Sequence, residues 1–146
     1  MEEALEPGAV LVRGGAAGFA QEIRAGRHRI RADEPLDSGG TDTGPSPYDL
    51  LLGALGACTS MTVALYARRR QWPLEAVTVR LRHSRVHSED CADCETRPVK
   101  LDIIDTEIAL TGALSEGQRS QLRDIAERCP VHQTLTSEIT IHTRLV

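Results

Sequence analysis

Two cysteines in unlike settings are the residues of this chain best able to do chemistry. Cys58 lies in the apolar run Leu-Gly-Ala-Cys-Thr, and Cys129 begins the segment Cys-Pro-Val-His. A cysteine thiolate can reduce a peroxide and become a sulfenic acid, which a second thiol then converts to a disulfide. If the fold brings Cys58 and Cys129 together, the pair can reduce an oxidant.

The two settings predict different routes to an ionised thiol. Cys129 precedes Pro130, a residue suited to the first position of a helix, so backbone N–H groups there can stabilise a thiolate. His132 follows and can orient or protonate nearby groups, although a structural hydrogen bond is its ordinary role. Cys58 lies about three turns into a helix, where the helix dipole has little effect. We expect a cation from the fold or from a partner subunit to activate it; otherwise Cys58 is a small core residue.

A second group of imidazole and sulfur side chains lies between residues 83 and 94. A Cys-x2-Cys pair with a nearby histidine suits a tetrahedral zinc site. Residues four apart on a strand are about 13 Å apart, so His83 and His87 cannot share one ion. The expected ligands are therefore His87, Cys91 and Cys94, with a fourth from elsewhere. An auxiliary dithiol and an inert acidic hairpin tip are the alternatives.

A long helix must position Cys58. Ser46 suits the N-cap, Pro47 the first helical position, and Asp49 the reciprocal capping position, so the helix should run from 47 to about 70. Two apolar rows follow the helical spacing. The first contains Leu51, Leu55, Cys58, Thr62 and Leu65, and the second contains Leu50, Ala54, Ala57, Met61 and Ala64. So broad an apolar surface predicts a helix covered by a sheet or by a second subunit.

The remaining pattern predicts strands on both sides of this helix. Strands are expected at 9–13, 19–24, 27–32, 76–87, 98–110 and 138–145, with a loop at 33–45 and a helix capped by Ser115 and Gln118. The apolar parity changes between Ile103 and Ile104, which predicts a β-bulge. The final strand should point Ile139, Ile141 and Leu145 inward. This order predicts one α+β domain spanning 1–146.

Composition limits the classes of function. The chain has 146 residues and a net charge of −4, which disfavours nucleic-acid binding. The arginines at 68–70 suit a helix C-terminus, and no stretch approaches the about 20 apolar residues of a membrane span. We therefore expect a soluble, cytoplasmic protein without a membrane partner. Four cysteines in a reducing compartment favour redox or metal roles over structural disulfides.

Four segments together resemble the OsmC/Ohr superfamily of osmotically inducible and organic-hydroperoxide-resistance proteins. They are Asp-Glu-Pro at 33–35, Gly-Pro-Ser-Pro-Tyr-Asp-Leu-Leu at 44–51, Gly-Ala-Cys-Thr at 56–59 and Cys-Pro-Val-His at 129–132. The resemblance implies an OsmC-like fold, with antiparallel sheets packed around a long central helix in an intertwined homodimer. It also implies that Cys58 attacks the peroxide and Cys129 resolves the sulfenic acid.

The implied function is a thiol-dependent peroxidase that reduces organic hydroperoxides in oxidative or osmotic stress defence. A thiol or dithiol would regenerate it, and no cofactor is required. Family peroxidases carry a glutamate where this chain has Tyr48, and an arginine near Ala16 and Ala17. The nearest substitutes are Asp49 for the carboxylate and Arg13 or Arg24 for the guanidinium. The alternatives are a non-catalytic stress protein that binds a small molecule or zinc at Cys91 and Cys94, and a purely structural dimer.

Overall fold

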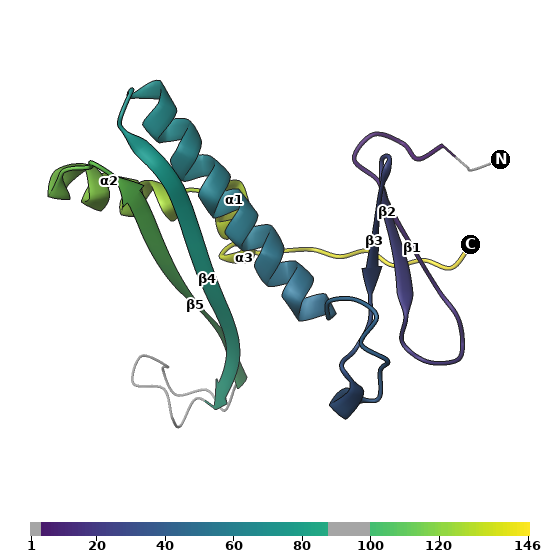
Figure 1. The fold of residues 1–146 in the computed structure, drawn as a ribbon. Coiled ribbons are helices and arrows are strands. Elements are labelled where there is room, and N and C mark those ends of the chain that lie inside the picture. Colours follow the sequence, from purple (N-terminus) through teal and green to yellow (C-terminus); the bar gives the residue numbers. More distant parts are fainter. Residues whose placement is uncertain (1–3, 88–99) are drawn as a thin grey trace. The chain divides into compact units, whose positions relative to one another are not determined.

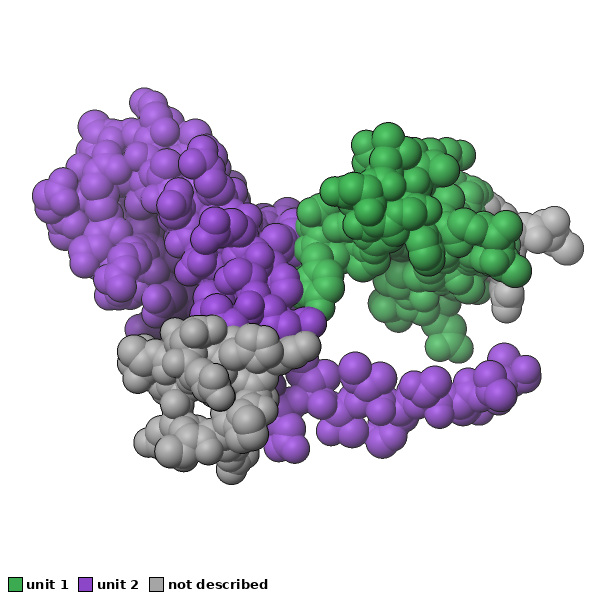
Figure 2. Space-filling model, turned by 90° about the horizontal axis from the view of Figure 1, so that it is seen from below, with its two compact units in different colours: residues 1–51 green, residues 52–146 purple. Residues whose placement is uncertain are grey.

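The computed structural model describes residues 4–87 and 100–146 and divides into two compact units. Unit 1 comprises residues 1–51 and unit 2 comprises residues 52–146, shown in green and purple in Figure 2. Each unit is described by itself below.

Unit 1 is an antiparallel meander followed by a structured loop (Figure 1). Its strands are β1 (Val10–Gly14), β2 (Gln21–Ala25) and β3 (His28–Ala32), and β2 lies in the middle of the sheet. The three strands predicted from the sequence are confirmed. A short 3-10 helix, η1 (Leu36–Ser38), interrupts the loop that follows.

One buried carboxylate organises this loop. Asp33, only 2% exposed, accepts a hydrogen bond from the Glu34 N–H at one oxygen. Its other oxygen accepts from the Thr41 hydroxyl and from both the hydroxyl and the N–H of Thr43. The Asp33 N–H donates to the Pro45 carbonyl, which closes the loop. The threonine hydroxyls, Thr43 first, hold the pKa of Asp33 far below its ordinary value.

The long helix α1 (Pro47–Arg69) begins as its sequence predicts. The Ser46 N–H donates to the Asp49 carboxylate and the Asp49 N–H donates to the Ser46 hydroxyl, so each residue satisfies a donor that the helix start would leave unpaired. The helix ends where Gln71 adopts a left-handed conformation (φ 56°) just before Trp72 and Pro73.

The buried face of α1 differs from both apolar rows predicted above. It consists of Leu55, Gly56, Thr59, Val63 and Ala67. Most of the predicted apolar side chains lie on the opposite face, where Met61 is 70% and Leu65 is 42% exposed. The expectation that no stretch approaches the length of a membrane span is wrong, because α1 is long and apolar enough, with a mean hydropathy of 1.7 over an 18-residue window. A core helix of a soluble protein meets the same criterion.

The strands β4 (Leu74–His87) and β5 (Lys100–Gly112) form a long antiparallel hairpin beside α1 (Figure 1). The predicted bulge between Ile103 and Ile104 is wrong, because these residues pair in continuous register with Ser84 and His83. The change in the alternation of apolar residues arises because β5 carries apolar side chains on both of its faces near its start. The register shift lies at the other end of the hairpin, where Glu75 is the extra residue.

Two helices complete unit 2, α2 (Glu116–Ala126) and α3 (Pro130–Leu135). The predicted capping box of Ser115 and Gln118 is confirmed, with both reciprocal hydrogen bonds present. A core cluster joins α1 to α2 and consists of Val63, Ala67, Leu122 and Ala126. Gly56 allows close packing of α1 on the hairpin, since a Cβ there would lie 2.7 Å from a methyl group of Leu81.

The predicted final strand at 138–145 is wrong for the single chain. These residues belong to no helix or strand, and their apolar side chains are open to solvent rather than inward. Ile139 is 53%, Ile141 82% and Leu145 fully exposed. A strand needs a neighbouring edge for its backbone hydrogen bonds, and this segment pairs with neither sheet of the described residues.

Candidate redox site

Cys129 is buried at the start of α3. It is the N-cap residue of that helix, with Pro130 at the first helical position, and its side chain is 0% exposed. The His132 N–H donates a hydrogen bond to the Cys129 Sγ over 3.3 Å. The predicted backbone donor at this sulfur is therefore present. His132 contributes this contact through its backbone.

A second contact joins Cys129 to α1. The Thr59 Oγ1 lies 3.7 Å from the Cys129 Sγ, and Thr59 is itself only 3% exposed. Thr59 directly follows Cys58 in the sequence, so the fold brings Cys129 against the turn of α1 that carries the other cysteine. Both cysteines are free thiols. Cys58 is partly exposed, whereas Cys129 is fully buried. Their reaction with each other stays a prediction.

A cavity of about 280 Å³ adjoins this contact. Thr59 and His132 both line it, and its wall also contains Arg123 of α2 and Glu127, the C-cap residue of that helix. The rest of its lining is mainly aliphatic, from Leu55, Ile104, Thr106, Ile108 and Ala126. Sequence reasoning missed Thr59. The available signal was a hydroxyl residue directly after the cysteine, but Ser60 and Thr62 carry hydroxyls nearby and made Thr59 hard to single out.

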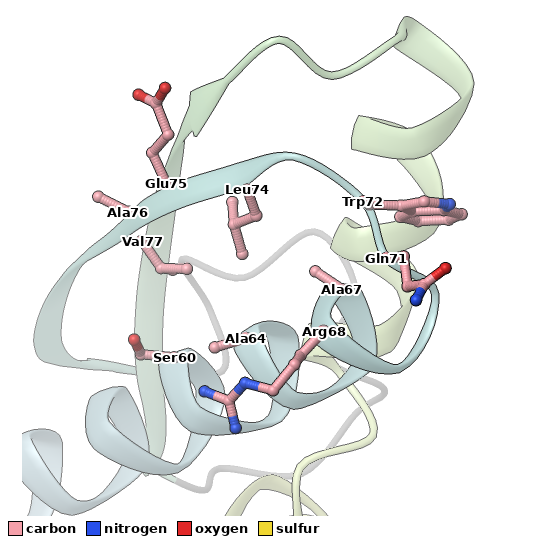
Figure 3. Close-up of a pocket in the computed structure, with 10 residues that line it drawn as sticks. All are labelled: Ser60, Ala64, Ala67, Arg68, Gln71, Trp72, Leu74, Glu75, Ala76 and Val77. Atoms are coloured by element: carbon pink, nitrogen blue, oxygen red, sulfur yellow. The ribbon is translucent and has the colours of Figure 1, made fainter.

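A larger cavity of about 510 Å³ lies between the second half of α1 and the start of β4 (Figure 3). Small side chains open it, from Ser60, Ala64 and Ala67 on α1 to Ala76 on β4. Its charged lining residues are Arg68 and Glu75. Neither Cys58 nor Cys129 lines this cavity, so it is separate from the candidate redox site.

The groups predicted to activate Cys58 belong to unit 1, whereas both cysteines belong to unit 2. Asp49 caps the start of α1. It precedes Cys58 by nine residues, which in a helix is about 13 Å along the axis and half a turn around it. In unit 1, Arg24 is buried in β2 and Arg13 is exposed in β1. Within the described residues of unit 2, no ion pair or hydrogen bond reaches the Cys58 side chain. The catalytic role of Asp49 stays a prediction.

The predicted zinc ligands fall largely outside the described residues. Cys91 and Cys94 lie between the two described ranges, and His87 is the last residue of β4. No group of three potential metal ligands is gathered elsewhere in residues 4–87 and 100–146. The zinc site therefore stays a prediction.

His83, which the sequence placed beside that set, has a carboxylate partner. Its Nε2 lies 2.8 Å from the Asp102 Oδ1, and the Arg85 Nε donates to the same oxygen over 3.0 Å. The hydrogen bond from His83 is the larger cause of a lowered Asp102 pKa, and Arg85 adds to it. These contacts connect β4 to β5 through one shared oxygen.

Comparison with known proteins identifies the architecture. A family profile described as OsmC-like protein matches residues 40–144. The search of curated proteins found no match. An OsmC-like protein from Mycoplasma pneumoniae superposes with a TM-score of 0.68 at 20% identity, over 87% of this chain and 85% of that one.

Two further solved structures extend the likeness. The organic hydroperoxide resistance protein OsmC from Legionella pneumophila gives a TM-score of 0.64 at 21% identity over 92% of each chain. An organic hydroperoxide resistance protein from Elizabethkingia anophelis gives 0.64 at 14% identity, over 87% of this chain and 86% of that one. At these identities the likeness shows the fold. The predicted α+β class, with antiparallel sheets and a long helix, is confirmed.

Proposed function

Because the chain belongs to the OsmC-like protein family, we propose that it is a thiol-dependent peroxidase that reduces organic hydroperoxides with Cys58 and Cys129. The observation that carries the proposal is the contact of the buried Cys129 sulfur with Thr59, the residue next to Cys58. Two structural relatives are named for organic hydroperoxide resistance, which supports this substrate class.

The proposed cycle has three steps. The Cys58 thiolate attacks one peroxide oxygen, the O–O bond breaks, and the alkoxide that leaves takes up a proton to become the alcohol. Cys58 is then a sulfenic acid, and the Cys129 thiol attacks its sulfur to form the disulfide and release water. A small thiol or dithiol reduces the disulfide by exchange and is itself oxidised. These steps need no cofactor.

The working form is proposed to be a homodimer. The face of α1 opposite its buried face, here called the outer face, exposes Leu51, Met61 and Leu65. The C-terminal segment exposes Ile139 and Ile141. Apolar surface of this kind marks an interaction site, and a second copy would cover both regions. The apolarity of α1 then serves packing rather than membrane insertion.

A dimer would also complete the chemistry at Cys58. This thiol is partly exposed on α1 and needs a cation to be ionised. A second copy is the proposed source of that cation, with Arg13 and Arg24 as the guanidinium candidates from the sequence. Asp49 is the candidate for the carboxylate that family peroxidases carry. We place the protein in the cytoplasm, where reduced thiols are maintained.

Replacement of each cysteine by serine tests the cycle. Cys58→Ser should abolish consumption of an organic hydroperoxide, because the attacking sulfur is gone. Cys129→Ser should still consume about one equivalent and then accumulate a sulfenic acid at Cys58 that dimedone traps for mass spectrometry. Unchanged turnover in Cys58→Ser would reject the proposal. Absent turnover in the native protein, together with stoichiometric zinc that is lost on replacing Cys91 and Cys94, would favour the metal-binding alternative.

A further inference from the structure

We propose that Thr59 is a positioning residue for disulfide closure: its hydroxyl holds the reduced Cys129 thiol beside the turn of α1 that carries Cys58. The inference rests on the proposed function and adds to it a residue that acts through Cys129. The carrying observation is the 3.7 Å separation of Thr59 Oγ1 and Cys129 Sγ, with both side chains nearly or fully buried.

The two hydrogen-bond contacts of the Cys129 sulfur have different roles. The His132 N–H donates to the sulfur, so it occupies one lone pair. The thiol proton then needs an acceptor, because a buried donor without a partner is unfavourable. Among the described residues, the Thr59 hydroxyl oxygen is the side-chain acceptor at hydrogen-bonding distance from this sulfur. We therefore assign the thiol as donor and the hydroxyl as acceptor.

These contacts fix the sulfur from two elements. The His132 N–H holds it from the start of α3, and Thr59 holds it from α1. Without the hydroxyl, the thiol keeps only the contact from its own helix and is free to rotate away from α1. During closure the sulfur must approach Cys58, so a loss of positioning slows the step even though the reacting groups are unchanged.

The neighbouring residues supply matched variants. Thr59→Val removes the hydroxyl and keeps the branched shape, whereas Thr59→Ser keeps the hydroxyl and removes the methyl group. Thr62→Val is the control. Thr62 lies one turn after Cys58 on the same helix, and among the described residues the hydrogen bonds of the Cys129 sulfur go to Thr59 and His132 instead. A general effect of the substitution near Cys58 would appear in this control as well.

Closure can be measured without any peroxide. In full-length protein with Cys91 and Cys94 replaced by serine, the disulfide dithiobis(nitrobenzoate) should label the partly exposed Cys58 before the buried Cys129. Labelling forms a mixed disulfide and releases one thionitrobenzoate. The Cys129 thiol then loses its proton to solvent, and the thiolate attacks the Cys58 sulfur, closes the protein disulfide and expels a second thionitrobenzoate anion. The rate of the second release reports closure alone.

Thr59→Val should slow the second release about fivefold, the factor expected for loss of one hydrogen bond. Thr59→Ser should restore the native rate, and Thr62→Val should match it. Thermal melts of all variants separate slow closure from unfolding. A native rate in Thr59→Val, or equal slowing in Thr62→Val, would overturn the inference, as would a native protein that never closes. Rapid closure in a protein that consumes no peroxide would reject the peroxidase proposal and leave the role of Thr59 standing.

Discussion

The two faces of α1 differ in how far residues of the same chain cover them. On the inner face, Val63 and Ala67 are fully buried and pack against Leu122 of α2. On the outer face, Met61 and Leu65 are equally apolar but largely exposed. One helix therefore carries two apolar surfaces, one of which is covered by its own chain.

The two thiols follow the same division. Cys129 is buried and held by hydrogen bonds against the inner face, whereas Cys58 is only partly covered and, within the described residues of unit 2, has no hydrogen bond or ion pair. The comparison suggests that one chain prepares the resolving thiol and leaves the attacking thiol to be completed by association. Under the proposed function, the inner face would supply stability, and the outer face would supply the interface and the peroxide chemistry.

The largest predicted effect comes from placing a charge on the outer face. Met61→Glu should convert the proposed dimer to monomers, because an unpaired carboxylate in an apolar interface is unfavourable by about 3–5 kcal/mol, or more than a hundredfold in the dissociation constant. Sedimentation equilibrium measures the change. Peroxide turnover should fall together with dimerisation.

Thr78→Glu adds the same charge at an exposed position of β4 and serves as the matched control. It should leave the dissociation constant unchanged. A native protein that is monomeric at micromolar concentration, or a Met61→Glu dimer of native affinity, would remove the basis for treating the outer face as an interface.

The second prediction compares Leu122 of α2, which packs against the inner face of α1, with Leu65 on the outer face of α1. Leu122→Ala should lower the free energy of unfolding by about 3 kcal/mol, because this fully buried side chain leaves a cavity. Leu65→Ala should lower it by less than about 0.5 kcal/mol in the monomeric Met61→Glu protein, where residue 65 stays exposed. Urea denaturation gives both values. A similar loss at the two sites in the monomer would mean that the outer face is covered by its own chain.

Local signals in the sequence predicted much of the fold. Ser46 with Asp49 and Ser115 with Gln118 predicted helix starts because capping depends on a few neighbouring residues. Cys129 before Pro130 predicted a helix start with a donor at the sulfur for the same reason. The long hairpin followed from alternation, which also depends on nearby residues.

Features that depend on long-range packing were not predictable in this way. The core face of α1 could not be assigned because both faces are apolar, so periodicity did not distinguish the one that the chain itself covers. The bulge was misplaced because β5 carries neighbouring apolar residues on its two faces, Ile103 on one and Ile104 on the other, in continuous register. The segment 138–145 has the alternation of a strand but no partner edge within the described chain. The Thr59 contact joins residues far apart in sequence, and no local pattern reports such a pair.

The smallest predicted effect concerns a polar cluster that one chain completes by itself. Thr41→Val removes one of the hydrogen bonds to the Asp33 carboxylate and should lower the melting temperature by a few degrees at pH 7, whereas Thr78→Val should not. Because the native pKa of Asp33 is lowered, this stabilisation is complete above the ordinary aspartate pKa of about 3.9 and is lost as the pH falls toward the native value. The difference between native and variant melting temperatures should therefore narrow below about pH 4. A difference that stays constant from pH 7 to strongly acidic pH would mean that the carboxylate charge does not hold the loop, and a difference that changes with protein concentration would mean that this cluster also depends on a second copy.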